Sequence, residues 1–315
     1  MPIDPQIEAM FAGQPDWGPV RAVPVDQLRA AVRQASIQMP PPPVSLADVA
    51  DRTIPGPAGD IPVRIYTPEG TGPFPVTVYF HGGGFVVGDL DTQDMIARGL
   101  CGGAKTLVVS VDYRLAPEHK FPAAPDDAWA AVQWAAAHAE ALGGDPALLA
   151  VAGDSAGGVL ASAMTLLARE AGTPRLTALV NWYGPGIHPI PNEGSAVEFA
   201  NGPVLRLDDA HYFWELYLEN EAQFDDVRAS PAKAQNHAGL PPAYIASAEC
   251  DPIRDSVEMY ADVLKAAGVE TEVHRYPGMV HGFVSWVGFL PGAQQSMADA
   301  CDFLARHFSA ARAGT

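Results

Sequence analysis

Short apolar runs rich in β-branched residues alternate with longer helical segments along most of this chain. The runs that predict strands are 61–66, 76–80, 107–113, 148–152, 176–182, 243–247 and 269–276. The segments that predict helices are 126–142, 159–171, 256–267 and 293–308. Because a buried strand that is followed by a helix returns to pair in parallel, this order predicts an α/β fold with a mainly parallel sheet.

Two stretches interrupt this alternation. In residues 1–45, the segment 27–38 has helical spacing and the prolines 40–43 end it, since proline lacks the N–H that a helix needs. Residues 186–230 contain prolines, acids and the aromatic cluster Tyr212, Phe213, Trp214 and Tyr217, which predicts a helical insertion. We expect 46–185 and 231–315 to be the two parts of the α/β domain. We expect 1–45 and 186–230 to form a cap over the carboxyl edge of its sheet.

Composition excludes several classes of partner. The chain has 37 acidic and 19 basic residues, a formal net charge of −18, and no run rich in Lys or Arg. Nucleic acids and anionic membranes bind clustered positive charge, so we expect neither as a partner. No run reaches the ~18 apolar residues of a membrane span, so we expect no stable membrane insertion. The first residues lack the basic and apolar regions of a secretory signal, which favours a cytoplasmic location.

The cysteine pattern gives no sign of a metal site. Cys101, Cys250 and Cys301 are far apart, and no Cys-x-x-Cys or Cys-to-His ligand spacing occurs. We expect three buried, reduced thiols, and no metal-binding or cofactor-binding residues.

Residues 153–157 read Gly-Asp-Ser-Ala-Gly, between a predicted strand and a predicted helix. Glycines at these positions permit a sharp turn that lifts the Ser155 hydroxyl clear of the backbone. The free N–H groups at the start of the next helix favour developing negative charge. The pattern indicates that Ser155 is a nucleophile. A glycine-rich turn with an ordinary serine is the alternative.

Residues 81–85 read His-Gly-Gly-Gly-Phe, directly after the predicted strand 76–80. Consecutive glycines let backbone N–H groups approach a ligand. Such a loop forms an oxyanion hole together with the N–H of the residue after the nucleophile. The donors would be Gly83, Gly84 and Ala156. We expect His81 to order the loop rather than to act as the base.

A serine nucleophile needs a base, and the base needs a carboxylate to orient it. His281 lies in a glycine-flanked loop after the last predicted strand. Glu249, Asp251 and Asp255 follow the predicted strand 243–247, and the residues alone leave the choice of acid open. Both loops follow strands, so they should meet Ser155 at the carboxyl edge of the sheet.

Five motifs in this order resemble the hormone-sensitive-lipase family of α/β-hydrolases, the bacterial family IV carboxylesterases. They are HGGGF (81–85), YRLAPEHKFPAAPDD (113–127), GDSAGG (153–158), DPIRD (251–255) and HGF (281–283). The resemblance covers the chain from about residue 64 onward, and GDSAGG is typical of the GDSAG subgroup. It implies an eight-stranded, mainly parallel sheet with a helical cap.

The resemblance also implies roles for single residues. Ser155 is the nucleophile, His281 the general base and Asp251 the orienting acid, with an oxyanion hole at Gly83, Gly84 and Ala156. Tyr113, Arg114 and Glu118 are expected to support the oxyanion loop, and Asp154 is expected to be a support rather than an acid. The sequence departs from the family at Ser256, where an acid is common, and at Val159, where Asn is common. Val159 is expected near the acyl side of the substrate.

The implied activity is hydrolysis of short- to medium-chain acyl esters through an acyl-enzyme, without a metal or an organic cofactor. The aromatic-rich cap should enclose a pocket for acyl groups of about four to eight carbons. An amidase or peptidase with the same triad is one alternative, because fold and triad do not separate amides from esters. A non-catalytic small-molecule receptor is another, although receptors on this fold lack the triad histidine. The resemblance suggests a homodimer through the last strand, with a monomer as the alternative.

Overall fold

The computed structural model describes residues 2–13 and 18–314, so residues 1 and 14–17 of the predicted cap segment lie outside the described residues. Across the described residues one sheet of eight strands forms, in the order β1-β2-β4-β3-β5-β6-β7-β8. The strands are β1 (Leu46–Gly56), β2 (Gly59–Pro68), β3 (Phe74–Phe80), β4 (Leu107–Val111), β5 (Gly144–Asp154), β6 (Ala178–Trp182), β7 (Ala243–Cys250) and β8 (Thr271–Val280). β1 and β2 are antiparallel, and β3 to β8 are parallel. The expected α/β fold with a mainly parallel, eight-stranded sheet is confirmed.

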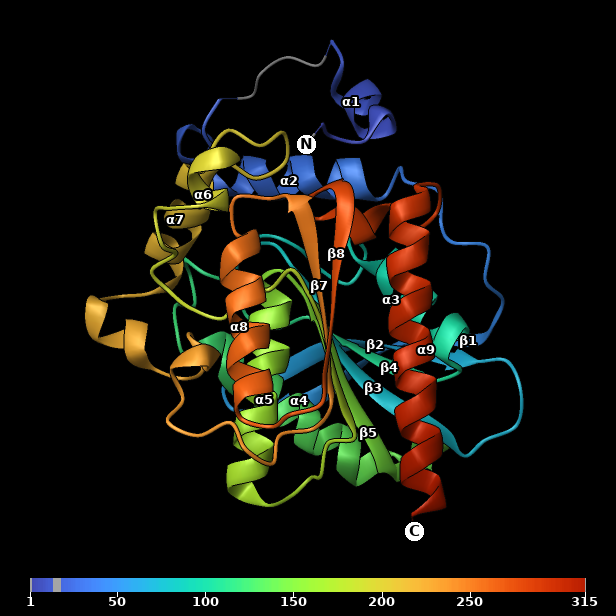
Figure 1. Cartoon of the computed structure of the whole chain (residues 1–315). Helices are drawn as coiled ribbons and strands as arrows, with labels where there is room; N and C mark the ends of the chain where they lie inside the picture. Colours follow the sequence, from blue (N-terminus) through green and yellow to red (C-terminus); the bar gives the residue numbers. More distant parts are fainter. Residues whose placement is uncertain (1, 14–17, 315) are drawn as a thin grey trace.

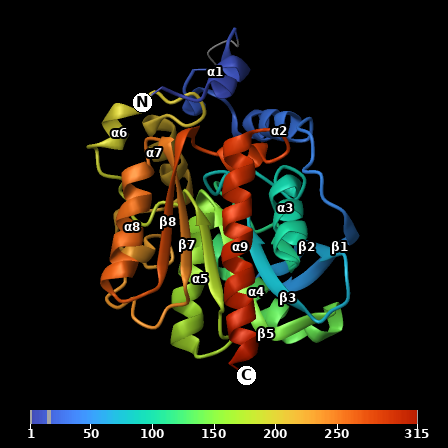
Figure 2. The ribbon, with the colours of Figure 1, turned by 45° about the vertical axis from the view of Figure 1, so that its right-hand side comes forward.

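Helices cover both faces of the sheet (Figures 1 and 2). On one face lie α3 (Asp94–Ala104) and α9 (Pro291–Ala313). On the other face lie α4 (Ala123–His138), α5 (Ala156–Ala171) and α8 (Arg254–Ala266). Because both faces are covered, the central strands β4 and β6 are buried along their whole length, which explains their nearly continuous apolar sequence.

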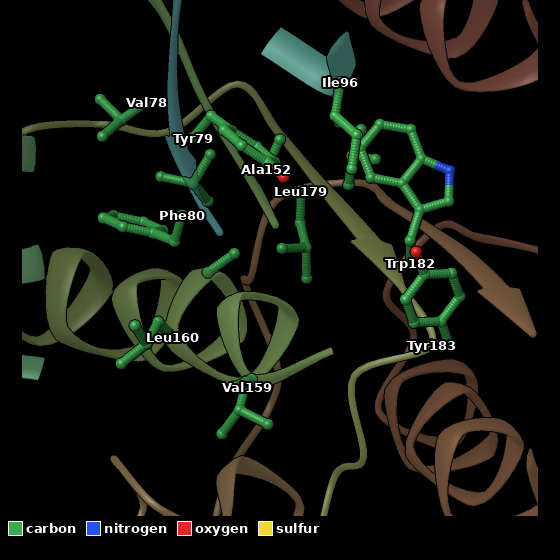
Figure 3. Packing of buried hydrophobic residues seen from close by; sticks show 14 of the residues in the cluster. Val78, Tyr79, Phe80, Ile96, Ala152, Val159, Leu160, Leu179, Trp182 and Tyr183 are labelled. Carbon is green, nitrogen blue, oxygen red and sulfur yellow. The ribbon is translucent and has the colours of Figure 1, made fainter. Parts of the chain in front are cut away.

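The core lies between the sheet and these helices. Figure 3 shows Phe80 of β3 close to Leu160 of α5, with Ile96 of α3 on the other side of the strands. All three side chains are fully buried. This packing fixes the end of β3 against α5, and β3 pairs in parallel with β5 up to Phe80 and Gly153, so both strands end at the candidate site.

Four helices lie at the carboxyl edge of the sheet, at the top of Figure 1. They are α1 (Pro5–Phe11), α2 (Val25–Ser36), α6 (Ser195–Glu198) and α7 (Leu207–Tyr217). The helix predicted over 27–38 is present as α2, and residues 186–230 contain α6 and α7. None of the described helices is long and apolar enough to cross a membrane.

Two elements are absent from the sequence prediction. β1 is an edge strand whose residues are mostly exposed, so its sequence has no alternation of apolar and polar residues. α3 contains three glycines, which disfavour a helix in isolation. A Cβ on Gly99 would lie 2.9 Å from Met297 Cε, and one on Gly103 would lie 2.5 Å from Cys301 Sγ. The glycines thus let α3 pack closely against α9. The strands and helices that the sequence did predict are present, with ends shifted by a few residues.

Candidate active site

Ser155 lies in the tight turn between the end of β5 and the start of α5. Its backbone has φ 52° and ψ −120°, a conformation that costs energy for a residue with a side chain. A Cβ on Gly153 would lie 2.1 Å from the Gly157 oxygen, and one on Gly157 would lie 2.0 Å from the Phe80 oxygen. The turn therefore requires both glycines of the Gly-x-Ser-x-Gly motif. The Ser155 N–H donates to the Trp182 carbonyl at 2.8 Å, which ties the turn to β6.

A chain of hydrogen bonds joins Ser155, His281 and Asp251, which follow β5, β8 and β7. Ser155 Oγ is 2.8 Å from His281 Nε2, and His281 Nδ1 is 2.7 Å from Asp251 Oδ2. Asp251 is fully buried, and its other oxygen accepts from the Ile253 N–H at 3.0 Å. Because a carboxylate accepts hydrogen bonds, Nδ1 carries the imidazole proton and Nε2 accepts from the serine hydroxyl. A base placed this way can take the serine proton during nucleophilic attack.

The structure separates the three carboxylates that the sequence leaves as candidates. Asp251 contacts His281, whereas Glu249 accepts from the Gly278 N–H at 2.8 Å. Asp255 accepts from the Ser195 N–H at 2.7 Å and from Arg254 at 2.9 Å. Only Asp251 of the three is thus placed to orient the imidazole.

The glycine loop after β3 lines the same pocket as Ser155. Gly83 and Gly84 have φ of 120° and 60°, conformations that favour glycine. Among the described residues, no group accepts a hydrogen bond from the N–H of Gly83, Gly84 or Ala156. All three residues line the same pocket as Ser155 and His281. The predicted oxyanion-hole residues are thus brought to one place, with donors available for a developing oxyanion.

Asp154 holds the glycine loop in place through a hydrogen bond from the loop backbone. Its Oδ1 accepts from the Gly82 N–H at 2.9 Å and from the Tyr79 hydroxyl at 2.6 Å. Burial raises the pKa of its carboxyl to about 6. No hydrogen bond joins Asp154 to Ser155 or His281 within the described part of the chain, which agrees with a support rather than a second acid. Sequence reasoning missed Tyr79, because nothing in an apolar strand distinguishes it.

His81 also lies beneath the loop. It is fully buried and stacks on Tyr113 with ring centres 4.3 Å apart, and the Tyr113 hydroxyl donates to the His81 carbonyl at 2.6 Å. Burial lowers the pKa of His81 to about 4, so the ring is neutral near pH 7, and Nδ1–H donates to the Gly82 carbonyl at 2.7 Å. Through these contacts His81 and Tyr113 hold the backbone at the start of the glycine loop, as expected of residues that support it.

The other two predicted supports lie further from the loop. Arg114 pairs with Asp127 at 2.7 Å, and Glu118 pairs with Arg29 of α2 at 2.8 Å. Arg29 also donates to the Val86 carbonyl, just beyond the loop, at 2.8 Å. Sequence reasoning missed Arg29, which lies 57 residues away in sequence from its partner.

The pocket above Ser155 has a volume of about 210 Å³. Ligand pockets for drug-sized molecules span roughly 300–1,000 Å³, so this pocket suits a small substrate. Its lining is mostly apolar and includes Val159, Phe213 and Trp214. Of the predicted aromatic cluster, Tyr217 instead stacks on Phe85 at 3.8 Å. Gln93 and Ser285 also line the pocket, and no sequence signal had singled them out.

A possible metal-binding group lies apart from this pocket. Glu270, Glu272 and His307 are the one such cluster in residues 2–13 and 18–314. Both oxygens of Glu272 already accept from Arg306, at 2.9 and 3.0 Å. None of the three residues lines the pocket, so the cluster has no place in the chemistry at Ser155. All three cysteines are buried, as expected.

Comparisons with known proteins find several similar chains. A family model described as the alpha/beta hydrolase fold matches residues 77–285. The chain is 43% identical to "Esterase LipI" of Mycobacterium tuberculosis over 298 residues, which are 93% of this chain and 92% of that protein. It is 40% identical to "Carboxylesterase NlhH" of the same species over 301 residues, again 93% of this chain and 92% of that protein. Among solved structures, a hyperthermophilic esterase from Pyrobaculum calidifontis superposes with a TM-score of 0.89 at 35% identity, covering 97% of this chain and 99% of that one.

Proposed function

This chain belongs to the hormone-sensitive-lipase family of α/β-hydrolases and is a carboxylic ester hydrolase, and from that premise we propose that it cleaves short- to medium-chain acyl esters through an acyl-enzyme on Ser155. The observation that carries the proposal is the hydrogen-bonded chain from Ser155 through His281 to Asp251, open to an apolar pocket.

Acylation begins when Ser155 Oγ attacks the ester carbonyl and His281 Nε2 takes its proton. Asp251 keeps the proton on Nδ1 and stabilises the imidazolium that forms. His281 then gives the proton to the leaving alcohol oxygen, and the acyl group stays on Ser155. The 2.8 Å contact between Ser155 Oγ and His281 Nε2 permits the first transfer, and the 2.7 Å contact with Asp251 holds the ring in place.

The tetrahedral intermediate places a negative charge on the former carbonyl oxygen. The N–H groups of Gly83, Gly84 and Ala156 are the donors for this oxyanion. Loss of one such donor costs about 3–4 kcal/mol of transition-state stabilisation in comparable enzymes. Deacylation repeats the sequence with water as the nucleophile, activated by His281.

The cap is part of the same proposal, with residues 1–45 and 186–230 as its two segments and 46–185 and 231–315 as the two parts of the catalytic domain. Contacts between the two cap segments support this division. The Val20 N–H donates to Asp209 at 2.7 Å, and Arg21 pairs with Glu215 at 2.9 Å. Phe213 of the second segment lies directly over Gly84, where a Cβ would come within 2.4 Å of its ring.

A series of p-nitrophenyl esters from acetate to palmitate tests the substrate class. We expect kcat/KM to be highest for acyl chains of about four to eight carbons, because the pocket is small and residues of the second cap segment line part of it. Rates that rise toward palmitate would contradict the proposal. A matched phenyl ester and anilide test the reaction type, and faster cleavage of the anilide would make the enzyme an amidase instead.

We further propose a homodimer through β8, the last strand of the sheet, whose outer edge pairs with no other strand among the described residues. An open edge strand can pair with a second copy. Light scattering that gives a mass near that of one chain, 33.2 kDa, would reject the dimer.

A further inference from the structure

One part of the pocket wall is polar apart from the proposed catalytic groups. Gln93 precedes α3, and Ser285 lies on the short 3-10 helix Phe283–Trp286 that follows His281. Both line the pocket, and both are partly buried. Ser285 Oγ donates to Gln93 Oε1 at 3.5 Å, a long and weak hydrogen bond.

Both side chains keep hydrogen-bonding capacity beyond this contact. With Oε1 toward Ser285, the Gln93 Nε2–H₂ group has no acceptor in the part of the chain that the structure describes. The Ser285 oxygen can still accept a hydrogen bond. A ligand that brings a hydroxyl or a carbonyl oxygen to this point can bond to both side chains.

The direction of proton transfer from His281 indicates which part of an ester contacts Gln93 and Ser285. His281 Nε2 must protonate the leaving oxygen, so the alcohol part of the substrate lies on the side of His281. Ser285 lies four residues after His281, on the 3-10 helix Phe283–Trp286, and it contacts Gln93; all three residues line the same pocket. Val159 lies instead on α5, which starts directly after Ser155, and it offers an apolar surface to the acyl chain.

We propose that Gln93 and Ser285 form a leaving-group subsite that selects esters whose alcohol carries a hydrogen-bonding oxygen, such as glycol monoesters, over esters of plain alkyl alcohols. This inference rests on the proposed esterase function. A plain alkyl group would displace water from the Gln93 amide without replacing its hydrogen bond. A hydroxyl group on the alcohol restores that bond, which is the basis of the selection.

Two esters with the same acyl group and the same number of heavy atoms test the subsite. They are 2-hydroxyethyl butyrate and propyl butyrate, compared by titrating the butyric acid released. The readout is the kcat/KM for 2-hydroxyethyl butyrate divided by the kcat/KM for propyl butyrate. Changes in folding or in Ser155 chemistry affect both values equally and cancel in this ratio. We expect Gln93→Leu to lower this ratio about tenfold and Ser285→Ala to lower it about threefold, as the loss of one hydrogen bond does.

Gln133→Leu is the matched control, because Gln133 is exposed on α4 and lies outside the pocket. Its ratio should equal that of the wild type. If Gln93→Leu does not fold, Ser285→Ala carries the test. A ratio that stays within twofold of the wild type in both subsite variants would overturn the inference. So would a wild type that cleaves p-nitrophenyl butyrate but not 2-hydroxyethyl butyrate. Inactivity toward every ester would instead overturn the proposed function, and this inference with it.

Discussion

Arg29 joins the N-terminal segment to the oxyanion loop, and its replacement tests whether that segment takes part in catalysis. Its guanidinium donates to the carbonyls of Val86 and Ala116 at 2.8 and 2.9 Å, and it pairs with Glu118. The Val86 N–H in turn donates to the Gly83 carbonyl at 3.0 Å. Arg29→Met keeps most of the side-chain stem but removes every donor.

The structure sets the size of the expected effect. The Glu118 side chain is 54% exposed, so this ion pair contributes under ~1 kcal/mol. Each hydrogen bond from a charged donor to a carbonyl contributes about 1.5–3 kcal/mol, and water can replace part of it at this partly exposed site. We expect Arg29→Met to lower the free energy of unfolding by about 2–4 kcal/mol.

The effect on turnover should be larger than a loss of stability alone produces. A shift of Val86 would move Gly83, whose N–H is a proposed oxyanion donor. Complete loss of one donor lowers kcat by about 10²–10³, so a displaced donor should lower it about tenfold. KM should change little, because the oxyanion exists only in the transition state.

Kinetics on p-nitrophenyl butyrate and urea denaturation measure both quantities. Arg29→Lys should recover part of the lost kcat, because an ammonium group can still donate to one of the two carbonyls. Arg52→Met, at an exposed position of β1, is the control and should match the wild type. An Arg29→Met enzyme that is less stable yet keeps its kcat would show that Arg29 does not position the oxyanion loop.

Three further predictions follow from the site. Gly157→Ala places a Cβ 2.0 Å from the Phe80 oxygen, so it should lower the free energy of unfolding by about 3 kcal/mol and abolish most activity. A variant as stable as the wild type in urea would be inconsistent with the turn described. Asp251→Asn should lower kcat by about 10⁴ with the fold intact by circular dichroism, because an amide favours the wrong tautomer of His281, and a loss below tenfold would remove Asp251 from its role. Burial lowers the pKa of His81 from 6.5 in the unfolded chain to about 4 in the folded chain. The imidazole is therefore protonated first in the unfolded chain, and stability is lost as the pH falls through that range. From pH 7 to pH 5 this group alone should cost about 2 kcal/mol, a loss that His81→Asn should lack when unfolding is measured at both pH values.

The parts of the site that follow from local chemistry could be predicted from the sequence. The turn at Ser155 needs glycines on both sides, and the loop at Gly83 and Gly84 needs glycine conformations, so each leaves a short motif in the chain. Both follow predicted strands, and parallel strands end at one edge of the sheet. The position of the site in the fold follows from these facts.

The rest depends on contacts between distant segments. The sequence offered three candidate acids, Glu249, Asp251 and Asp255, and only the path of the chain after β7 brings Asp251 to His281. Arg29 and Gln93 have no motif around them, because their partners lie far away along the chain. α3 could not be predicted for a related reason. Its glycines allow close packing against α9, whereas glycines in a sequence usually indicate a turn.

One paired measurement tests whether Ser155 is the nucleophile of an esterase. Wild type and Ser155→Ala are assayed on p-nitrophenyl butyrate, and each is treated with a phosphonate ester and weighed intact by mass spectrometry. We predict that the wild type is active and gains one phosphonyl group, whereas Ser155→Ala loses on the order of 10⁶ in kcat and gains none. A Ser155→Ala protein that keeps most of its activity, or that still takes up the phosphonyl group, would show that Ser155 is not the nucleophile.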